Sequence, residues 1–235
     1  MTESVQDLRA EGLFYRKKFL LSIIIPLAII ILMWLEMLTA VITQSDFTFL
    51  GIFPLEAKGI PGIFLSPFVH ENFRHLVNNT LPFFLLSIAL FFFYSEVALR
   101  VLSWTWLLTG LFVWFGGRPA WHIGASGLVY GLASFLFFSG IIRRYYRLIA
   151  LSLLIVFLYG EMVWGIFPDV YKNISWESHM LGALSGIILA VIYRKEGPQR
   201  PVTEWPDEEE EKPDDQEFTE EDDPNSLPLG SDTLP

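Results

Sequence analysis

The chain has 235 residues, of which 52% are apolar and 18% charged, and its mean hydropathy is +0.43. Apolar content this high and this clustered excludes an ordinary soluble domain, so we expect a lipid bilayer around the chain and no nucleic-acid partner. Because the sequence contains no cysteine, disulfides, thiolate metal sites and cysteine nucleophiles are excluded. The net charge of −10 is unevenly spread, because residues 204–235 hold 14 of the 26 acidic side chains and 1 of the 16 basic ones.

Six apolar windows are long enough to cross a membrane. A hydrocarbon core about 30 Å thick needs roughly 20 consecutive apolar residues in a helix. The windows run over Phe19–Thr39, His75–Tyr94, Val97–Phe115, Ile123–Ile142, Leu148–Phe167 and Ser175–Tyr193. The first is too long for the apolar part of a signal peptide, so we expect it to stay in the mature protein. The sequence therefore predicts an all-α polytopic membrane protein, a bundle of six transmembrane helices.

The arrangement of charge predicts three segments and an orientation. We expect a cytoplasmic N-terminal segment over residues 1–15, the six-helix membrane domain over 16–197, and a disordered acidic cytoplasmic tail over 198–235. Basic residues cluster at the helix ends on one side: Arg16, Lys17, Lys18, Arg100, Arg143, Arg144, Arg147, Arg194 and Lys195. Because positive loops stay cytoplasmic, both termini are expected on the cytoplasmic side.

The connection between the first two windows, residues 40–74, is long and rich in glycine, proline and aromatic residues. A segment this apolar outside the spans is expected to lie at the membrane interface as short helices and turns.

The fourth window begins with a serine between glycines, in the run Gly124-Ala125-Ser126-Gly127. Small neighbours let another backbone come close and leave a hydroxyl accessible, as a nucleophile requires. Tyr130 follows four residues after Ser126, on the same helical face. Taken alone, this segment favours simple helix packing over a nucleophile, because serine and paired glycines are common in membrane bundles.

The sixth window supplies a possible base for that serine. His179, Gly182 and Gly186 are spaced by three and four residues and share one helical face. Gly127 and Gly131 form a similar pair of small residues in the fourth window, so the two helices can approach closely. If they meet along these glycines, the Ser126 hydroxyl and the His179 imidazole come within hydrogen-bond reach.

A third polar group lies at the start of the second window, where His75 and Asn79 are four residues apart on one face. Both side chains can donate hydrogen bonds to the oxyanion of an acyl-transfer reaction. A metal site formed with His70 and Glu71 is the alternative, but the five-residue spacing of the two histidines does not suit one face of a continuous helix, so we expect no metal. Asn78 begins a formal glycosylation sequon, but its position within a span argues against modification.

Together these patterns resemble the rhomboid family of intramembrane serine proteases, whose basic form has six transmembrane helices. The resemblance rests on three motifs in order: His70, His75 and Asn79 at the second helix, Gly124 to Gly127 with Tyr130 at the fourth, and His179, Gly182 and Gly186 at the sixth. It implies Ser126 as nucleophile, His179 as general base, and an oxyanion hole formed by the Ser126 N–H, His75 and Asn79.

The resemblance also implies that Tyr130 packs against the His179 ring, that His70 is structural, and that no cofactor is needed. The fifth helix would be a mobile wall through which a substrate helix enters. The expected activity is cleavage of transmembrane substrate proteins near the non-cytoplasmic membrane face.

Two other functions stay open at this point. A non-catalytic binder of transmembrane segments, acting in membrane-protein quality control, would use the same fold without cleavage. A transporter is disfavoured, because no inverted repeat is visible and the ionisable residues gather at one surface rather than at the midplane. Nothing in the sequence predicts an oligomeric state.

Overall fold

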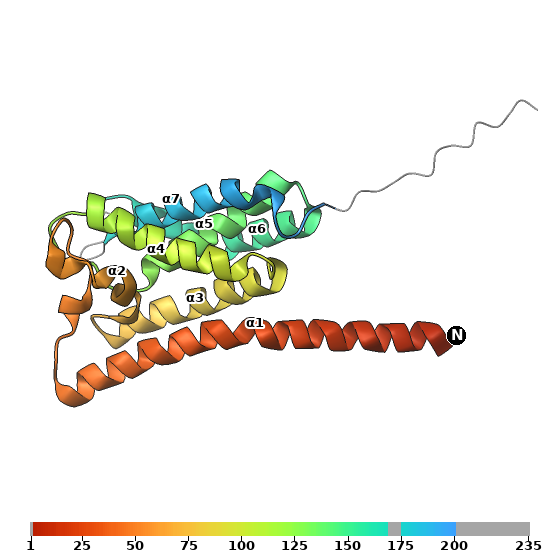
Figure 1. Ribbon diagram of the computed structural model, residues 1–235, viewed down its shortest axis with the longest axis horizontal. Helices are drawn as coiled ribbons and strands as arrows, with labels where there is room; N and C mark the ends of the chain where they lie inside the picture. Colours follow the sequence, from red (N-terminus) through yellow and green to blue (C-terminus); the bar gives the residue numbers. More distant parts are fainter. Residues whose placement is uncertain (1, 169–174, 201–235) are drawn as a thin grey trace, which may run out of the picture. The chain divides into compact units, whose positions relative to one another are not determined.

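The computed structural model describes residues 2–168 and 175–200, and in this part the chain is helical apart from turns and one isolated backbone bridge (Figure 1). The α-helices are α1 (Thr2–Thr43), α2 (Gly62–Leu65), α3 (Phe73–Phe93), α4 (Ala98–Gly116), α5 (Ser126–Arg143), α6 (Tyr146–Tyr159) and α7 (Trp176–Ile192). Short 3-10 helices lie at Thr48–Leu50, Ala57–Gly59, Ser66–Phe68, Gly160–Ile166 and Tyr193–Lys195.

Six helical stretches in the described residues are long and apolar enough to cross a membrane. They are Leu8–Thr43, Phe73–Phe93, Ala98–Gly116, Ser126–Arg143, Tyr146–Ile166 and Trp176–Lys195. Each contains most of one window expected from the sequence, which confirms the predicted all-α bundle. The chain is therefore an integral, multi-pass membrane protein.

Two elements differ in extent from the expected windows. Helix α1 begins at Thr2, so residues 2–15 continue the first transmembrane helix; this stretch has helix-forming residues and no proline. Helix α6 ends at Tyr159 and continues as a 3-10 helix over Gly160–Ile166, where Gly160 at the start and Gly165 near the end weaken the α-helical backbone. The expected acidic tail lies outside the described residues from position 201 onward.

Helix α5 is the centre of the bundle. It packs against α7, α6 and α3, while α4 covers α7 and α1 lies along α3 (Figure 1). In the apolar stretch of α5, 56% of the residues are buried, against 22% in α1 and in α6. The residues of α5 therefore have neighbours on most sides, whereas α1 and α6 present one long face each to lipid.

The contact between α5 and α7 follows the glycines that the sequence singled out. A Cβ atom on Gly182 would lie 2.1 Å from the carbonyl oxygen of Gly127, and one on Gly186 would lie 2.0 Å from that of Gly131. No side chain fits at these distances, so the two backbones touch directly. The prediction that these helices meet along their glycines is confirmed.

Helices α3, α5 and α7 all begin at the same end of the membrane domain, which we call the Ser126 end (Figure 1). The loop before α5 contacts His75 of α3 through Gly124, and the first turn of α5 contacts α7 through Gly127 and Ser178. The polar residues near the start of each of these three helices are thereby brought together.

Candidate active site

Ser126 is the first residue of α5, and the loop before it is shaped by Gly124. The backbone of Gly124 has a φ of +100°, a region that residues with a side chain rarely adopt. Its N–H donates to the Ser66 carbonyl at 2.9 Å, which ties the loop to the segment before α3. A Cβ at this position would lie 2.8 Å from Nε2 of His75. Only glycine therefore lets this loop pass so close to His75 and place Ser126 at the start of its helix.

His179 lies in the first turn of α7 with its ring buried and oriented. Its Nδ1 is 2.9 Å from the carbonyl oxygen of Gly165. A carbonyl can only accept a hydrogen bond, so Nδ1 carries the proton and Nε2 of the neutral ring keeps its lone pair. The ring is 6% exposed and stacks on Tyr130, with centroids 4.2 Å apart and planes 9° from parallel. The hydrogen bond fixes which nitrogen is available as a base, and the stacking fixes the plane of the ring.

Tyr130 is itself anchored away from α5. Its hydroxyl donates to the Met162 carbonyl at 2.7 Å, in the same 3-10 segment that supplies the Gly165 carbonyl. The packing of Tyr130 on His179 that the resemblance implied is thus present, and the hydroxyl of Tyr130 has a further partner in the segment that follows α6.

Ser126 and His179 are next to residues that make a close contact between α5 and α7 at this end of the bundle. A Cβ on Gly127, the neighbour of Ser126, would lie 3.2 Å from the carbonyl oxygen of Ser178, the neighbour of His179. Within the described residues there is no hydrogen bond between Ser126 Oγ and His179. Catalytic hydrogen bonds are often long without substrate, so the shared location is compatible with a dyad that tightens when substrate binds.

Asn79 offers a buried donor beside the serine loop. Its Nδ2 has no hydrogen-bond partner in the described residues, although the side chain is only 5% exposed. A Cβ atom built on Gly124 would lie 3.5 Å from Asn79 Nδ2 and 2.8 Å from the His75 ring. An unpaired buried amide costs about 1–3 kcal/mol. A negatively charged oxygen bound next to Gly124 would remove that cost.

His75 is positioned by its neighbours at the start of α3. The Asn72 side chain caps the helix by accepting from the His75 N–H at 2.9 Å. The His70 ring lies edge-on to the His75 ring, with centroids 5.1 Å apart, and its Nδ1 donates to the Phe68 carbonyl at 3.0 Å. Burial lowers the pKa of His70 to about 4, so this ring is neutral at physiological pH. These contacts give His70 the supporting position that the resemblance implied.

The described residues contain no group of three His, Asp or Glu side chains placed to hold a metal ion. The alternative metal site of His70, His75 and Glu71 therefore has no support from the arrangement of these side chains.

Comparison with known proteins identifies the family. The model of the rhomboid domain matches residues 58–196, which include α2 to α7 and every residue of the site described above. The chain belongs to the rhomboid family. Its family membership agrees with the resemblance drawn from the three motifs and with the six spans of the structure.

Relatives of this rhomboid occur in mycobacteria. Uncharacterized proteins of Mycobacterium tuberculosis and Mycobacterium bovis are each 32% identical to it over 186 residues, which cover 74% of this chain and 75% of the relative. An uncharacterized protein of Mycobacterium leprae is 29% identical over 194 residues, covering 79% of this chain and 76% of the relative. The similarity thus extends over most of each protein.

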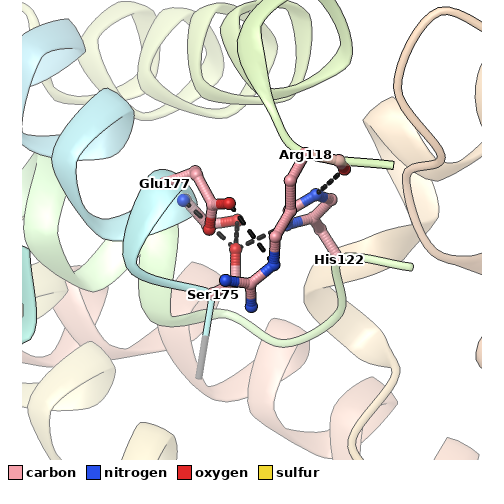
Figure 2. Close-up of polar contacts among 5 residues, drawn as sticks. Arg118, His122, Ser175 and Glu177 are labelled. Carbon is pink, nitrogen blue, oxygen red and sulfur yellow. Dashed lines mark hydrogen bonds and ion pairs between the residues drawn. The ribbon is translucent and has the colours of Figure 1, made fainter. Parts of the chain in front are cut away.

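The sequence reasoning missed a second polar cluster at the Ser126 end of this rhomboid. His122, in the loop before Ser126, bonds to Ser175 at the start of α7, and Arg118 pairs with Glu177, two residues after Ser175 (Figure 2). The one available signal was Ser175 itself, because serine just before an apolar helical run is typical of an N-cap. Its partner, 53 positions earlier in the chain, has no such signature.

Proposed function

We propose that this rhomboid is an intramembrane serine endopeptidase, with Ser126 as nucleophile and His179 as general base. Ser126 Oγ would attack the scissile carbonyl while its proton passes to Nε2 of His179. The same proton would then pass to the leaving amine as the carbon–nitrogen bond breaks, and water would hydrolyse the resulting ester. The observation that carries the proposal is the hydrogen bond from His179 Nδ1 to the Gly165 carbonyl at 2.9 Å, which leaves Nε2 as the basic nitrogen.

The oxyanion hole would consist of the Ser126 N–H and the side chains of His75 and Asn79. Three features support this assignment. Ser126 is the first residue of α5, so its N–H has no partner within the helix. The buried Nδ2 of Asn79 has no hydrogen-bond partner among the described residues. The His75 ring and Asn79 Nδ2 both lie beside Gly124, two residues before the nucleophile. Donors that are in place before the reaction act where charge develops in the transition state.

Substrate entry would take place between α3 and α6. A largely apolar groove with a cavity volume of about 330 Å³ lies there. Its lining includes Phe19, Leu85, Phe92, Leu154, Leu158 and Tyr159. This surface suits an apolar helix of a transmembrane substrate. The scissile bond must leave its helical hydrogen bonds before a nucleophile reaches it, so we expect helix-weakening residues near the cleavage site of a substrate.

The side of cleavage follows from the charge pattern. Basic residues gather at the opposite end of the bundle from Ser126, which favours cytoplasmic termini and a Ser126 end on the non-cytoplasmic side. Cleavage would then occur near the non-cytoplasmic face.

The experiment that tests the proposal combines probe labelling with cleavage of a single-span substrate. A fluorophosphonate should label purified wild-type protein on Ser126, and both Ser126→Ala and His179→Ala should abolish labelling and cleavage. The matched control is Ser22→Ala, which removes a buried hydroxyl of α1 whose one hydrogen-bond partner among the described residues is the Lys18 carbonyl, and it should leave both activities intact. Undiminished cleavage by Ser126→Ala would falsify the assignment.

The alternative is a non-catalytic rhomboid that binds transmembrane segments. The lack of a hydrogen bond between Ser126 Oγ and His179 in the described residues is the observation that favours it. Such a binder should retain a single-span protein without cutting it, and it should show no labelling that depends on Ser126.

A further inference from the structure

His122 lies between the two catalytic segments of the proposed protease. Its backbone forms a bridge with Ile52, in which each residue donates to the carbonyl of the other at 2.9 Å. The loop that carries His122 continues through Gly124 to Ser126. The position of this imidazole is thus fixed relative to the nucleophile and to the first interhelical connection.

The His122 side chain reaches across to α7. Its Nδ1 lies 2.6 Å from Ser175 Oγ, and its Nε2 lies 3.0 Å from the Arg118 carbonyl (Figure 2). Because the carbonyl only accepts, Nε2 carries the proton, and Nδ1 of the neutral ring accepts from the Ser175 hydroxyl. Burial lowers the pKa of His122, which agrees with a neutral ring.

Ser175 in turn holds the first turn of α7. It is the N-cap residue, and its Oγ accepts from the Ser178 N–H at 3.2 Å. The same oxygen lies 2.7 Å from Ser178 Oγ, and the Ser175 carbonyl accepts from the His179 N–H at 3.3 Å. The residue bonded to His122 is therefore bonded directly to the backbone of the proposed base.

A second link joins the same loop to the same turn. Arg118 Nε lies 3.4 Å from Glu177 Oε1, and Glu177 is 3% exposed (Figure 2). Arg118 thus pairs with Glu177, and His122 bonds to Ser175. We call these four residues, Arg118, His122, Ser175 and Glu177, the loop–helix brace.

We propose that His122 is a positioning residue that, through Ser175, sets the placement of His179 relative to Ser126. The role rests on the proposed protease function and adds to it. His122 is 2% exposed, so it acts through the brace and makes no contact with substrate. A misplacement of about 1 Å in reacting groups can cost on the order of a hundredfold in rate.

The variants separate the two hydrogen bonds of the ring. His122→Leu removes both, whereas His122→Asn keeps an acceptor near the place of Nδ1 for Ser175. Ser175→Ala removes the cap and the link, and Ser175→Thr keeps a hydroxyl that can serve both. Ser22→Ala is the matched control for Ser175→Ala, because Ser22 is a buried serine in α1 that, among the residues the structure describes, bonds only within its own helix.

The first measurement is the kinetics of fluorophosphonate labelling together with substrate cleavage. His122→Leu and Ser175→Ala should lower the labelling rate constant and kcat about ten- to a hundredfold, with full labelling amplitude and a KM within about twofold of wild type. His122→Asn and Ser175→Thr should recover most of the rate, and Ser22→Ala should match wild type. A lower amplitude with an unchanged rate constant would mean that the brace only stabilises the fold, and would overturn the proposal.

Hydrogen exchange of residues 175–182 tests the brace independently of catalysis. The first turn of α7 should exchange faster in His122→Leu than in wild type, and His122→Asn should restore protection. If wild type itself shows no labelling that depends on Ser126, the protease function fails, while the exchange result still decides whether His122 holds this turn. If His122→Leu had the same hydrogen-exchange rates in residues 175–182 and the same kcat as wild type, the positioning role would be overturned.

Discussion

Position 124 accepts only glycine, for two reasons. Its φ of +100° disfavours any side chain, and the His75 ring occupies the space that a Cβ would need. The same position brings the buried Asn79 amide to the loop before the nucleophile. The backbone at this point therefore decides how close the proposed oxyanion donors come to Ser126.

We predict that Gly124→Ala lowers the cleavage rate at least tenfold and destabilises the fold by about 1–3 kcal/mol. The methyl group would strain the backbone and displace His75, which lies 2.8 Å from the new atom. The measurement is the initial rate of cleavage of a single-span substrate, paired with a thermal unfolding curve.

Gly12→Ala is the control for that substitution. Gly12 lies within α1, and a Cβ there would meet nothing within 4 Å. Alanine is the better helix former by about 1 kcal/mol, so this variant should be as active as wild type and no less stable. Equal activity of the two variants would contradict the account of Gly124.

His70 makes the stability of the protein depend on pH. Burial lowers its folded-state pKa from 6.5 to about 4, so the unfolded chain binds a proton over this range that the folded chain does not. The free energy of unfolding should therefore fall as pH falls from 6.5 toward 4, by on the order of 3 kcal/mol. The measurement is the unfolding midpoint temperature as a function of pH.

His70→Gln isolates this contribution. The variant should lose part of the acid sensitivity between pH 6.5 and about 4. Some sensitivity should remain, because burial also lowers the pKa of His122. An identical pH dependence in wild type and variant would show that His70 does not contribute.

At the level of helices, α5 and α7 are joined a second time at the end of the bundle away from Ser126. Arg143, the last residue of α5, donates to Ser139 Oγ at 2.9 Å, to the Tyr193 carbonyl at 2.6 Å and to the Pro198 carbonyl at 3.0 Å. Its guanidinium also lies 5.4 Å from the centre of the Tyr94 ring. One buried cation thus satisfies carbonyl groups just beyond the end of α7.

We predict that Arg143→Met destabilises the protein by about 2–4 kcal/mol, because it leaves one buried and one partly buried carbonyl oxygen without this donor. The adjacent Arg144 is exposed, so Arg144→Met should change stability by less than about 0.5 kcal/mol. The measurement is the thermal unfolding midpoint of each variant in the same detergent. Equal midpoints would rule out a structural role for the buried arginine.

The glycines of the α5–α7 contact give a prediction of the same kind. A Cβ on Gly186 would lie 2.0 Å from the Gly131 carbonyl oxygen, so Gly186→Ala should force the helices apart and cost about 1–3 kcal/mol. Gly116→Ala is the control, since its nearest neighbour would be 3.9 Å away. Unfolding midpoints should separate the two variants by several degrees.

These elements also show what a single sequence reveals. The six spans could be predicted because the length of an apolar run shows whether it can cross the bilayer. The contact of α5 with α7 could be predicted because glycines spaced four residues apart let two helices pack closely. The hydrogen bond of His179 to Gly165 could not, because its acceptor is a backbone carbonyl in a 3-10 segment. The pairing of His122 with Ser175 was also hidden, because two connecting loops decide whether such distant residues meet.

For the molecule as a whole, the length of α1 bears on its placement in the membrane. Its 36 residues from Leu8 to Thr43 would extend about 54 Å at 1.5 Å per residue, well beyond a hydrocarbon core of about 30 Å. The helix must tilt or project from the bilayer. The basic run Arg16, Lys17 and Lys18 favours projection of the N-terminal turns into the cytoplasm.

The absence of cysteine from the sequence makes this orientation directly measurable. Arg9→Cys introduces a single thiol on the projecting part of α1, and Lys58→Cys introduces one on an exposed residue of the connection at the Ser126 end. A membrane-impermeant maleimide added to intact cells should label Lys58→Cys at once. It should label Arg9→Cys only after the membrane is permeabilised.

The wild-type chain, having no thiol, provides the background of that measurement. Six spans place Leu8 and Lys195 on the same side, so Arg194→Cys should behave as Arg9→Cys does. Labelling of Arg9→Cys in intact cells, with protection of Lys58→Cys, would reverse the orientation and place the Ser126 end toward the cytoplasm. The expected result would instead place Ser126 and His179 at the non-cytoplasmic side, and the substrates of the proposed protease would then have to present an unwindable segment at that face.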